Sequence, residues 1–338
     1  MKTELMVLEE KFIENRDIIK SAFPFESAYL YPACATVFLN AGKTADVGRL
    51  RECRALLKSK VNVFSNFRGA SEIITVAMLA ESEEPEKKLD NAIAAYKCLR
   101  EHFSAGSFLP LAAMLIAKER TASEFPEVAA DTRNIYKLMR KEHPLLTSDE
   151  DSVFAALIAL SGQRASDMIT EIERNYRILK EKFFSANAVQ SLSHVLSLCP
   201  GSADEKCRKT IELFDTLKAR KMRYGTEYEL AILGVLAMLD KENDYIADRI
   251  EEVSLFLSSQ KGYGFWGAGK RERLMHAAML LTSALTIEQN HTLSESTMAV
   301  SAQQAAIAAA QSAALIAAQQ AAICSMMAAQ AASASASN

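Results

Sequence analysis

The stretches "NAIAAYKCLR" (91–100), "DTRNIYKLMR" (131–140) and "EIERNYRILK" (171–180) decide the fold, because each places a tyrosine in a similar context and the tyrosines are 40 residues apart. "TIELFDTLKAR" (210–220) and "RIEEVSLFLS" (249–258) continue the series after 38 and 39 residues. Apolar residues recur three and four positions apart among Lys, Arg and Glu, which is the pattern of an amphipathic helix with one solvent-exposed face. A repeat of about 40 residues predicts an array of similar helical units.

A second type of segment lies between these amphipathic helices and is apolar on nearly every side. Clear examples are "LPLAAMLIAK" (109–118), "SVFAALIALS" (152–161) and "ELAILGVLAML" (229–239). A helix of this kind is packed by neighbours all round. "FESAYLYPACATVFLN" (25–40) and "GKRERLMHAAMLL" (269–281) extend the pattern to both ends. We therefore expect an all-α protein of about seven helical hairpins that follow a first helix, without strands.

Two architectures fit an array of this kind. An α/α toroid closes around a central cavity, whereas an open α-superhelix presents a concave surface. The unusually apolar helices favour the toroid. We expect an N-terminal helix at 1–20, a hairpin repeat domain at 21–292 and an Ala-rich C-terminal helix at 293–338, which ends in a frayed Ser/Ala stretch and belongs to the same domain.

The composition excludes several classes of partner. The 39 basic and 42 acidic residues are interspersed and give a formal net charge of −3, so no basic field is present for nucleic acid. The six cysteines lack a C-x-x-C pair or a nearby histidine, which predicts reduced core thiols and no metal site. Acidic residues interrupt the N-terminal stretch where a signal peptide would be apolar, so we expect a cytoplasmic protein. The general character of the sequence suggests a bacterial origin.

The C-terminal segment carries no charge after Glu295 and is dominated by alanine, which predicts a helix. Glutamines recur along it and would need hydrogen-bond partners in lipid, so a membrane span is not expected. A helix with so many small residues can pack closely against a second copy, which suggests a homodimer.

The turn "QKGYGFWGAGK" (260–270) contains two overlapping motifs. A phosphate-binding loop is disfavoured, because Arg271 replaces the required Ser or Thr and a helical pattern precedes the loop instead of a strand. Gln260, Gly264 and Trp266 spell Q-x-x-x-G-x-W at a hairpin junction. This pattern resembles the glutamine-tryptophan motif of terpenoid cyclases and other α/α-toroid proteins, in which Gln caps a helix end and Trp stacks at the turn. The resemblance implies a structural turn with a buried Trp266.

Candidate catalytic groups are few. Terpenoid cyclases use an acidic cluster, and the nearest equivalent is Asp149, Glu150 and Asp151 at a predicted helix start, where stabilisation of the exposed N–H groups is the simpler role. Arg271 and His276 follow the Trp266 turn, and a hydrogen-bonded core histidine is the simpler role for His276. Because no established catalytic or zinc motif can be assembled, we expect no cofactor or metal, and an enzyme is not favoured.

Over its whole length the chain resembles a bacterial family catalogued as domain of unknown function 4003. The resemblance rests on "NVFSNFRGASEIITVAMLA" (62–80), "GYGFWGAGKRERLMHAAMLL" (262–281) and the Ala-rich terminus, and implies a cytoplasmic helical protein without an assigned activity. The sequence favours a binding or scaffold protein that holds a peptide, protein or small molecule on its concave or central face. The alternative is an α/α-toroid enzyme acting on an isoprenoid, glycan or other small molecule in the central cavity.

Overall fold

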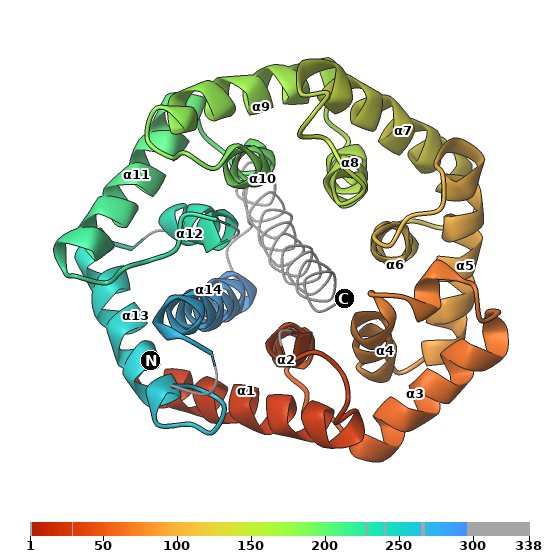
Figure 1. Cartoon of the computed structure of the whole chain (residues 1–338), viewed down its shortest axis with the longest axis horizontal. Coiled ribbons are helices and arrows are strands. Elements are labelled where there is room, and N and C mark those ends of the chain that lie inside the picture. Colours follow the sequence, from red (N-terminus) through yellow and green to blue (C-terminus); the bar gives the residue numbers. More distant parts are fainter. Residues whose placement is uncertain (1, 29, 228, 240, 265–267, 296–338) are drawn as a thin grey trace, which may run out of the picture. The chain divides into compact units, whose positions relative to one another are not determined.

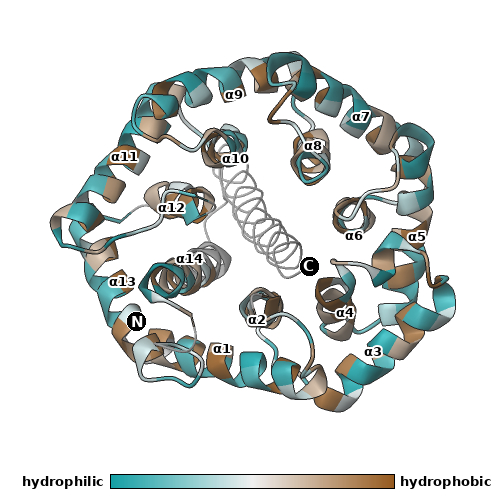
Figure 2. Ribbon diagram, in the orientation of Figure 1, coloured by the Kyte–Doolittle hydropathy of each residue, from teal (hydrophilic) through white to brown (hydrophobic). Residues whose placement is uncertain are grey.

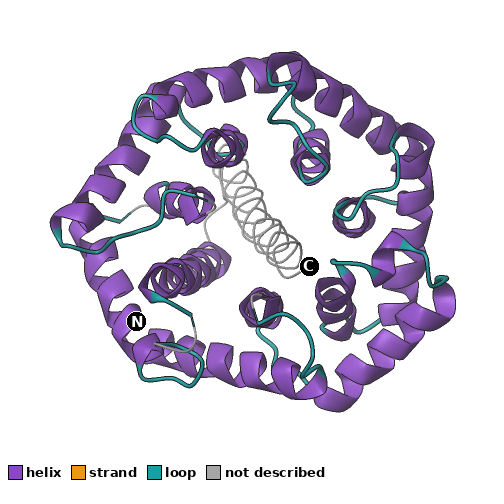
Figure 3. Ribbon diagram, viewed as in Figure 1, coloured by secondary structure: helices purple, strands orange, loops and turns teal. Residues whose placement is uncertain are grey.

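The computed structural model describes residues 2–28, 30–227, 229–239, 241–264 and 268–295. Within these ranges the regular structure is helical throughout, with 14 α-helices, one short 3₁₀ helix and no strand (Figure 3). The predicted all-α class is therefore confirmed.

The helices alternate between two types along the chain. The amphipathic helices are α1 (Lys2–Ala22), α3 (Val47–Lys60), α5 (Pro85–His102), α7 (Phe125–Glu142), α9 (Ala165–Lys180), α11 (Ala203–Ala219) and α13 (Asn243–Ser258). The apolar helices are α2 (Leu30–Asn40), α4 (Glu72–Ala80), α6 (Leu109–Glu119), α8 (Asp151–Leu160), α10 (Ala186–Ser197), α12 (Glu229–Ala237) and α14 (Lys270–Glu295). In the described part of the chain, the alternation begins with the amphipathic α1 and ends with the apolar α14.

Burial follows the two sequence patterns. In α7, Ile135 and Met139 are buried while Lys137 is exposed, and the mixture of teal and brown along this helix is visible in Figure 2. In α6, by contrast, all residues of 109–116 are buried. A stripe of apolar side chains needs one packed face, whereas a continuous apolar run needs neighbours all round. The amphipathic helices therefore cover the apolar ones.

The repeated aromatic position of the sequence joins successive hairpins. The ring at this position on one amphipathic helix lies edge-on to a phenylalanine in the turn of the preceding hairpin. The pairs, with the distance between ring centroids, are Phe67–Tyr96 (5.1 Å), Phe103–Tyr136 (5.3 Å) and Phe183–Phe214 (5.1 Å). Edge-on aromatic pairs contribute about 0.5–1.5 kcal/mol beyond the area that they bury. At these three positions the aromatic residue of the sequence series contacts the turn of the hairpin that precedes its helix.

The helices pack into two compact units. Among the described residues, unit A comprises 14–169, and unit B combines 2–13 with those between 170 and 295. In unit A the apolar helices α4, α6 and α8 form a row, and α5 and α7 pack against each other and on α6 and α8 (Figure 1). In unit B the apolar helices α10, α12 and α14 form the row, and α11 and α13 pack against each other and on α12 and α14.

Candidate functional site

The turns that lead from an amphipathic helix to the next apolar helix lie at one end of each unit. Their residues in unit A are 23–28, 61–71, 103–108 and 143–150, and in unit B they are 181–185, 220–227, 259–264 and 268–269. We call these residues the turn edge of each unit. Contacts between the starts of neighbouring apolar helices indicate that these turns lie at the same end of the unit.

Unit A shows two contacts of this kind. Asp149, just before α8, accepts hydrogen bonds from the backbone N–H of Ser107 (2.6 Å) and Phe108 (3.4 Å), just before α6. Arg54 on α3 forms ion pairs with both Glu26 (2.7 Å), before α2, and Glu72 (2.5 Å), the first residue of α4. Because helix starts lie side by side in both pairs, the paired helices run in the same direction.

Unit B repeats the arrangement. The Ser185 hydroxyl, at the start of α10, donates to the Glu227 carboxylate (2.7 Å) before α12. Arg271, near the start of α14, donates to Glu229, the first residue of α12, through Nη2 (2.8 Å) and through Nε. The turn edge of each unit is therefore a row of helix starts tied together by carboxylates.

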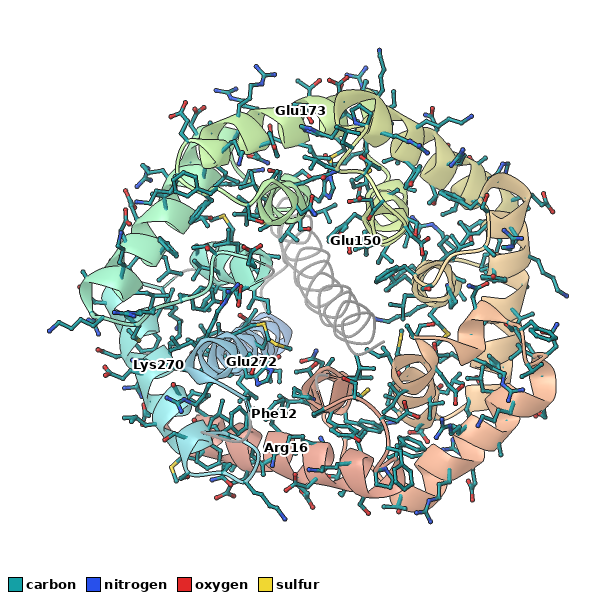
Figure 4. The ribbon with its side chains drawn as sticks, viewed as in Figure 1. Phe12, Arg16, Glu150, Glu173, Lys270 and Glu272 are labelled. Atoms are coloured by element: carbon teal, nitrogen blue, oxygen red, sulfur yellow. The ribbon has the colours of Figure 1, made fainter. Side chains whose placement is uncertain are left out.

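The acidic cluster of the sequence belongs to this row in unit A. Besides the contacts of Asp149, the buried Asp151 carboxylate accepts a hydrogen bond from the Ser148 backbone N–H (2.7 Å). Burial raises the pKa of Asp151 to about 8, although the bond from Ser148 opposes the shift. Burial, followed by the charge of Asp149, also raises the pKa of Glu150, which lies at the start of α8 (Figure 4). These contacts agree with the stabilisation of helix starts.

The Arg271 candidate is paired with a carboxylate that has no contact with solvent. The Glu229 side chain is 0% exposed, and it also accepts the Glu227 backbone N–H (3.1 Å). Arg271 itself remains half exposed. Breaking a buried ion pair by removing one partner is strongly destabilising, because the other charge stays buried without compensation. Arg271 therefore joins α14 to α12 and neutralises a buried charge.

Two glycines of the turn edge are required by these carboxylates. A Cβ atom at Gly225 would lie 2.1 Å from Cδ of Glu229, and one at Gly106 would lie 1.9 Å from Oδ1 of Asp149. Neither glycine leaves room for a side chain while the carboxylate keeps its position. The two carboxylates differ, however, because Glu229 is buried and Asp149 is exposed.

This difference yields a prediction. Gly225→Ala should lower the free energy of unfolding by about 2 to 3 kcal/mol, because Glu229 has nowhere to move without overpacking. Gly106→Ala should lower it by only about 1 kcal/mol, because Asp149 can swing into solvent and only its helix-capping bonds are lost. Urea denaturation of both variants measures the difference, and equal losses would contradict the structural role assigned to Glu229.

His276 lies in the core of unit B. Its Nδ1 atom is 2.9 Å from the hydroxyl of Tyr263, whose ring stands edge-on to the imidazole with centroids 5.7 Å apart. Phe12 of α1 approaches the other side, at 6.4 Å between centroids, and is labelled in Figure 4. The imidazole is buried and hydrogen-bonded, the surroundings of a core histidine.

The turn around Gly264 is closed by its own backbone. Gly264 has φ of +115°, which favours glycine, and its N–H donates to the carbonyl of Ala268 (3.2 Å), whose N–H in turn donates to Gly262 (2.9 Å). The Gln260 side-chain amide donates to its neighbour Ser259 (3.1 Å). Trp266 lies outside the described residues, so its burial stays a prediction. The helix α13 precedes the turn, where a phosphate loop would need a strand.

The structure thus divides the candidates between the units. Gln260, Gly264, Arg271 and His276 belong to unit B, whereas 149–151 belongs to unit A. Within the described ranges, no three His, Cys, Asp or Glu residues are grouped as a metal site. No described helix has the length and apolar character needed to cross a bilayer.

A buried ionic contact in unit B was not anticipated from the sequence. The Lys206 ammonium is buried, lies 2.8 Å from the Glu171 carboxylate and donates to the carbonyl of Cys199 (3.0 Å). The sequence does contain an indication of this contact, since Lys206 falls among apolar positions of α11.

Burial raises the pKa of both Cys199 and Cys207 to about 12, so these thiols stay protonated and inert at neutral pH.

The cysteines placed in the described part of the chain behave as expected of reduced thiols. All are free, and four of the five are buried. They are Cys34, Cys53, Cys98, Cys199 and Cys207, of which Cys98 is half-buried.

A set of exposed apolar side chains on the turn edge was not anticipated from the sequence. In unit A these are Phe25, Val63, Phe64 and Leu145, and in unit B the equivalent residue is Phe184. Each follows the end of an amphipathic helix, but this position alone does not indicate exposure, since Phe103 follows α5 in the same way and is buried. Large apolar side chains that are exposed together on one surface commonly mark an interaction site.

The fold and the turn edges define a helical array whose candidate acids hold helix starts and whose most strongly exposed apolar side chains lie in the turns. The model of a family described as "Protein of unknown function (DUF4003)" matches residues 15–321. The chain belongs to this family, as its sequence features indicated. No curated protein and no solved structure matches it.

Proposed function

We propose that the chain is a binding or scaffold protein and that the turn edge of unit A is a recognition surface. One observation carries the proposal: Phe25, Phe64 and Leu145 are 100%, 94% and 97% exposed. Side chains of this size contribute about 1.5–3 kcal/mol each when they are removed from water. A partner that covers them would gain that contribution without any rearrangement of the helices.

The proposed surface differs from the concave or central face expected from the sequence. The apolar helices offer little exposed area, because 73–79 in α4, 109–116 in α6 and 151–158 in α8 are buried without interruption. Aliphatic side chains that already contact one another leave no polar groups to orient a ligand. The turns, which carry exposed side chains of both apolar and charged type, suit recognition better.

The structural partners of the candidate catalytic residues support binding over catalysis. Asp149 holds the start of α6, Arg271 neutralises Glu229, and His276 is hydrogen-bonded to Tyr263. A general acid or base must reach a reacting group, and each of these side chains is engaged within the fold. The α/α-toroid enzyme is therefore the less supported hypothesis.

The remaining expectations from the sequence stay proposals. We retain a cytoplasmic location, a bacterial origin and the α/α toroid on the sequence patterns alone. A homodimer through the Ala-rich segment at 293–338 also stays a prediction, since residues 296–338 lie outside the described structure.

Photo-crosslinking tests the proposed surface. A benzophenone side chain is placed at position 25, 64 or 145, and the matched controls carry it at Gln163 or Lys87, which are exposed near the other end of unit A. Irradiation in the expressing cells should give discrete adducts, with protein or with phospholipid, from the three turn positions and none from the controls. Adducts that form equally well from both ends would contradict a recognition surface at the turn edge, as would their absence from all three turn positions.

A further inference from the structure

We infer that the partner of the turn edge of unit A is an anionic phospholipid surface. The inference rests on the proposed function and adds the chemical class of the partner. It depends on three properties of this edge, namely isolated apolar side chains that project from the turns, basic side chains beside them, and acidic side chains that are engaged within the fold.

The apolar side chains have the distribution expected of membrane anchors. All four of the large apolar residues that are strongly exposed in the described part of unit A lie on this edge: Phe25, Val63, Phe64 and Leu145. They come from three different hairpins rather than from one continuous groove. A protein partner needs contiguous complementary shape, whereas the acyl region of a membrane accepts separate side chains from several turns.

Basic residues flank these anchors because the amphipathic helices end in them. Lys20 precedes Phe25, and Arg140 and Lys141 precede Leu145. Lys58 precedes Phe64 and also pairs with Glu72 (3.7 Å). All four basic side chains are exposed. Lysine and arginine next to inserted apolar side chains attract anionic headgroups and contribute about 1 kcal/mol each near the surface.

Acidic residues of the same edge are engaged within the fold. Glu26 and Glu72 share Arg54, and Asp149 accepts backbone N–H groups. Asp151 is buried, and burial raises its pKa to about 8, so a substantial part of its population is uncharged at neutral pH. Glu142, which follows Lys141 at the end of α7, stays exposed, so these contacts reduce the negative charge that faces solvent at this edge without removing it.

The opposite end of unit A has a different character. The turn between α4 and α5 contains Glu81, Glu83 and Glu84, which form ion pairs with lysines. None of the strongly exposed large apolar residues in the described part of unit A lies there. The two ends therefore differ in the apolar side chains that they expose, which gives the unit one end suited to membrane insertion.

Co-sedimentation with vesicles tests the inference. The full chain is mixed with vesicles of phosphatidylcholine alone, or of equal parts phosphatidylcholine and phosphatidylglycerol. We expect binding to the anionic vesicles that weakens as the salt concentration rises, and little binding to phosphatidylcholine. Equal binding to both vesicles, or none to the anionic ones, would overturn the inference.

Two variants assign the binding to the turn edge. Phe25→Ser/Phe64→Ser/Leu145→Ser removes the anchors and should weaken binding at least tenfold. Lys20→Gln/Arg140→Gln/Lys141→Gln should weaken it by about fivefold for each charge removed. All six side chains are exposed, so both variants are expected to fold, which circular dichroism checks.

The matched control removes three exposed basic side chains from the other end of unit A, as Lys87→Gln/Lys118→Gln/Arg164→Gln, and should bind like the unaltered chain. Loss of binding in this control to the same degree as in the turn-edge variants would overturn the assignment. A protein adduct from positions 25 and 64, without vesicle binding, would overturn the lipid inference but leave the proposed function intact. Failure of both experiments would contradict both.

Discussion

Arg271→Met should lower the free energy of unfolding by about 3 to 5 kcal/mol, because it leaves a buried carboxylate without its cation. Glu229 is 0% exposed and is bound by Arg271 through both of its carboxylate oxygens. The same carboxylate accepts the Glu227 backbone N–H (3.1 Å), and Gly225 lies too close to let the side chain rotate away without strain. Urea denaturation at neutral pH measures the loss.

Two controls separate the buried charge from ordinary surface effects. Lys270→Met removes a neighbouring exposed cation at the start of the same helix and should change stability by less than about 0.5 kcal/mol (Figure 4). Glu229→Met/Arg271→Met replaces both partners and should recover most of the loss, because an apolar pair leaves no charge uncompensated. If Arg271→Met and Lys270→Met were equally stable, Glu229 would not depend on Arg271.

The fold was predictable where the sequence carries local information. Tyr96, Tyr136 and Tyr176 fall on α5, α7 and α9, each an amphipathic helix, as the 40-residue spacing predicts. The apolar runs fall on α6, α8 and α12 in the same way. Helix type depends on the periodicity of neighbouring residues, so a single sequence contains the signal.

The candidate recognition surface was harder to predict, because it depends on contacts between distant residues. Phe64, Phe103 and Phe184 each precede a serine, yet Phe103 is buried while the other two are almost fully exposed. Near Phe64 and Phe184, the phenylalanines that are buried are instead Phe67 and Phe183, which pack on the next amphipathic helix. Local sequence does not reveal which of two nearby phenylalanines makes that contact.

The pairing of Arg271 was hidden for the same reason. Its partner Glu229 is 42 residues away along the chain, one hairpin earlier. The sequence showed an arginine beside a histidine on an apolar helix, which suggested catalysis as readily as structure. Only the packing of α14 on α12 reveals the carboxylate that the arginine neutralises.

Asp151→Asn should make the protein more stable at alkaline pH. The free energy of unfolding should also change less with pH in this variant than in the unaltered protein. The buried Asp151 has its pKa raised to about 8, so the folded state holds this proton more tightly than the unfolded chain, in which the pKa of Asp is about 3.9. The protonated Asp151 carboxyl therefore contributes its full stabilisation below about pH 4, and this contribution is lost as the pH rises through about 8. The asparagine stays neutral and can still accept the Ser148 N–H through its carbonyl oxygen.

The expected gain above about pH 8 is as much as about 5 kcal/mol, from a difference of about four pKa units at 1.36 kcal/mol each. Near pH 4 the two proteins should differ little. Burial also raises the pKa of Glu9, to about 7, but this group is present in both proteins and cancels in the difference. Asp149→Asn is the matched control, because it makes the same change at an exposed position two residues away and should give no comparable gain at alkaline pH. Urea denaturation across this range measures the effect, and parallel curves for the unaltered protein and Asp151→Asn would show that Asp151 is ionised in the folded state.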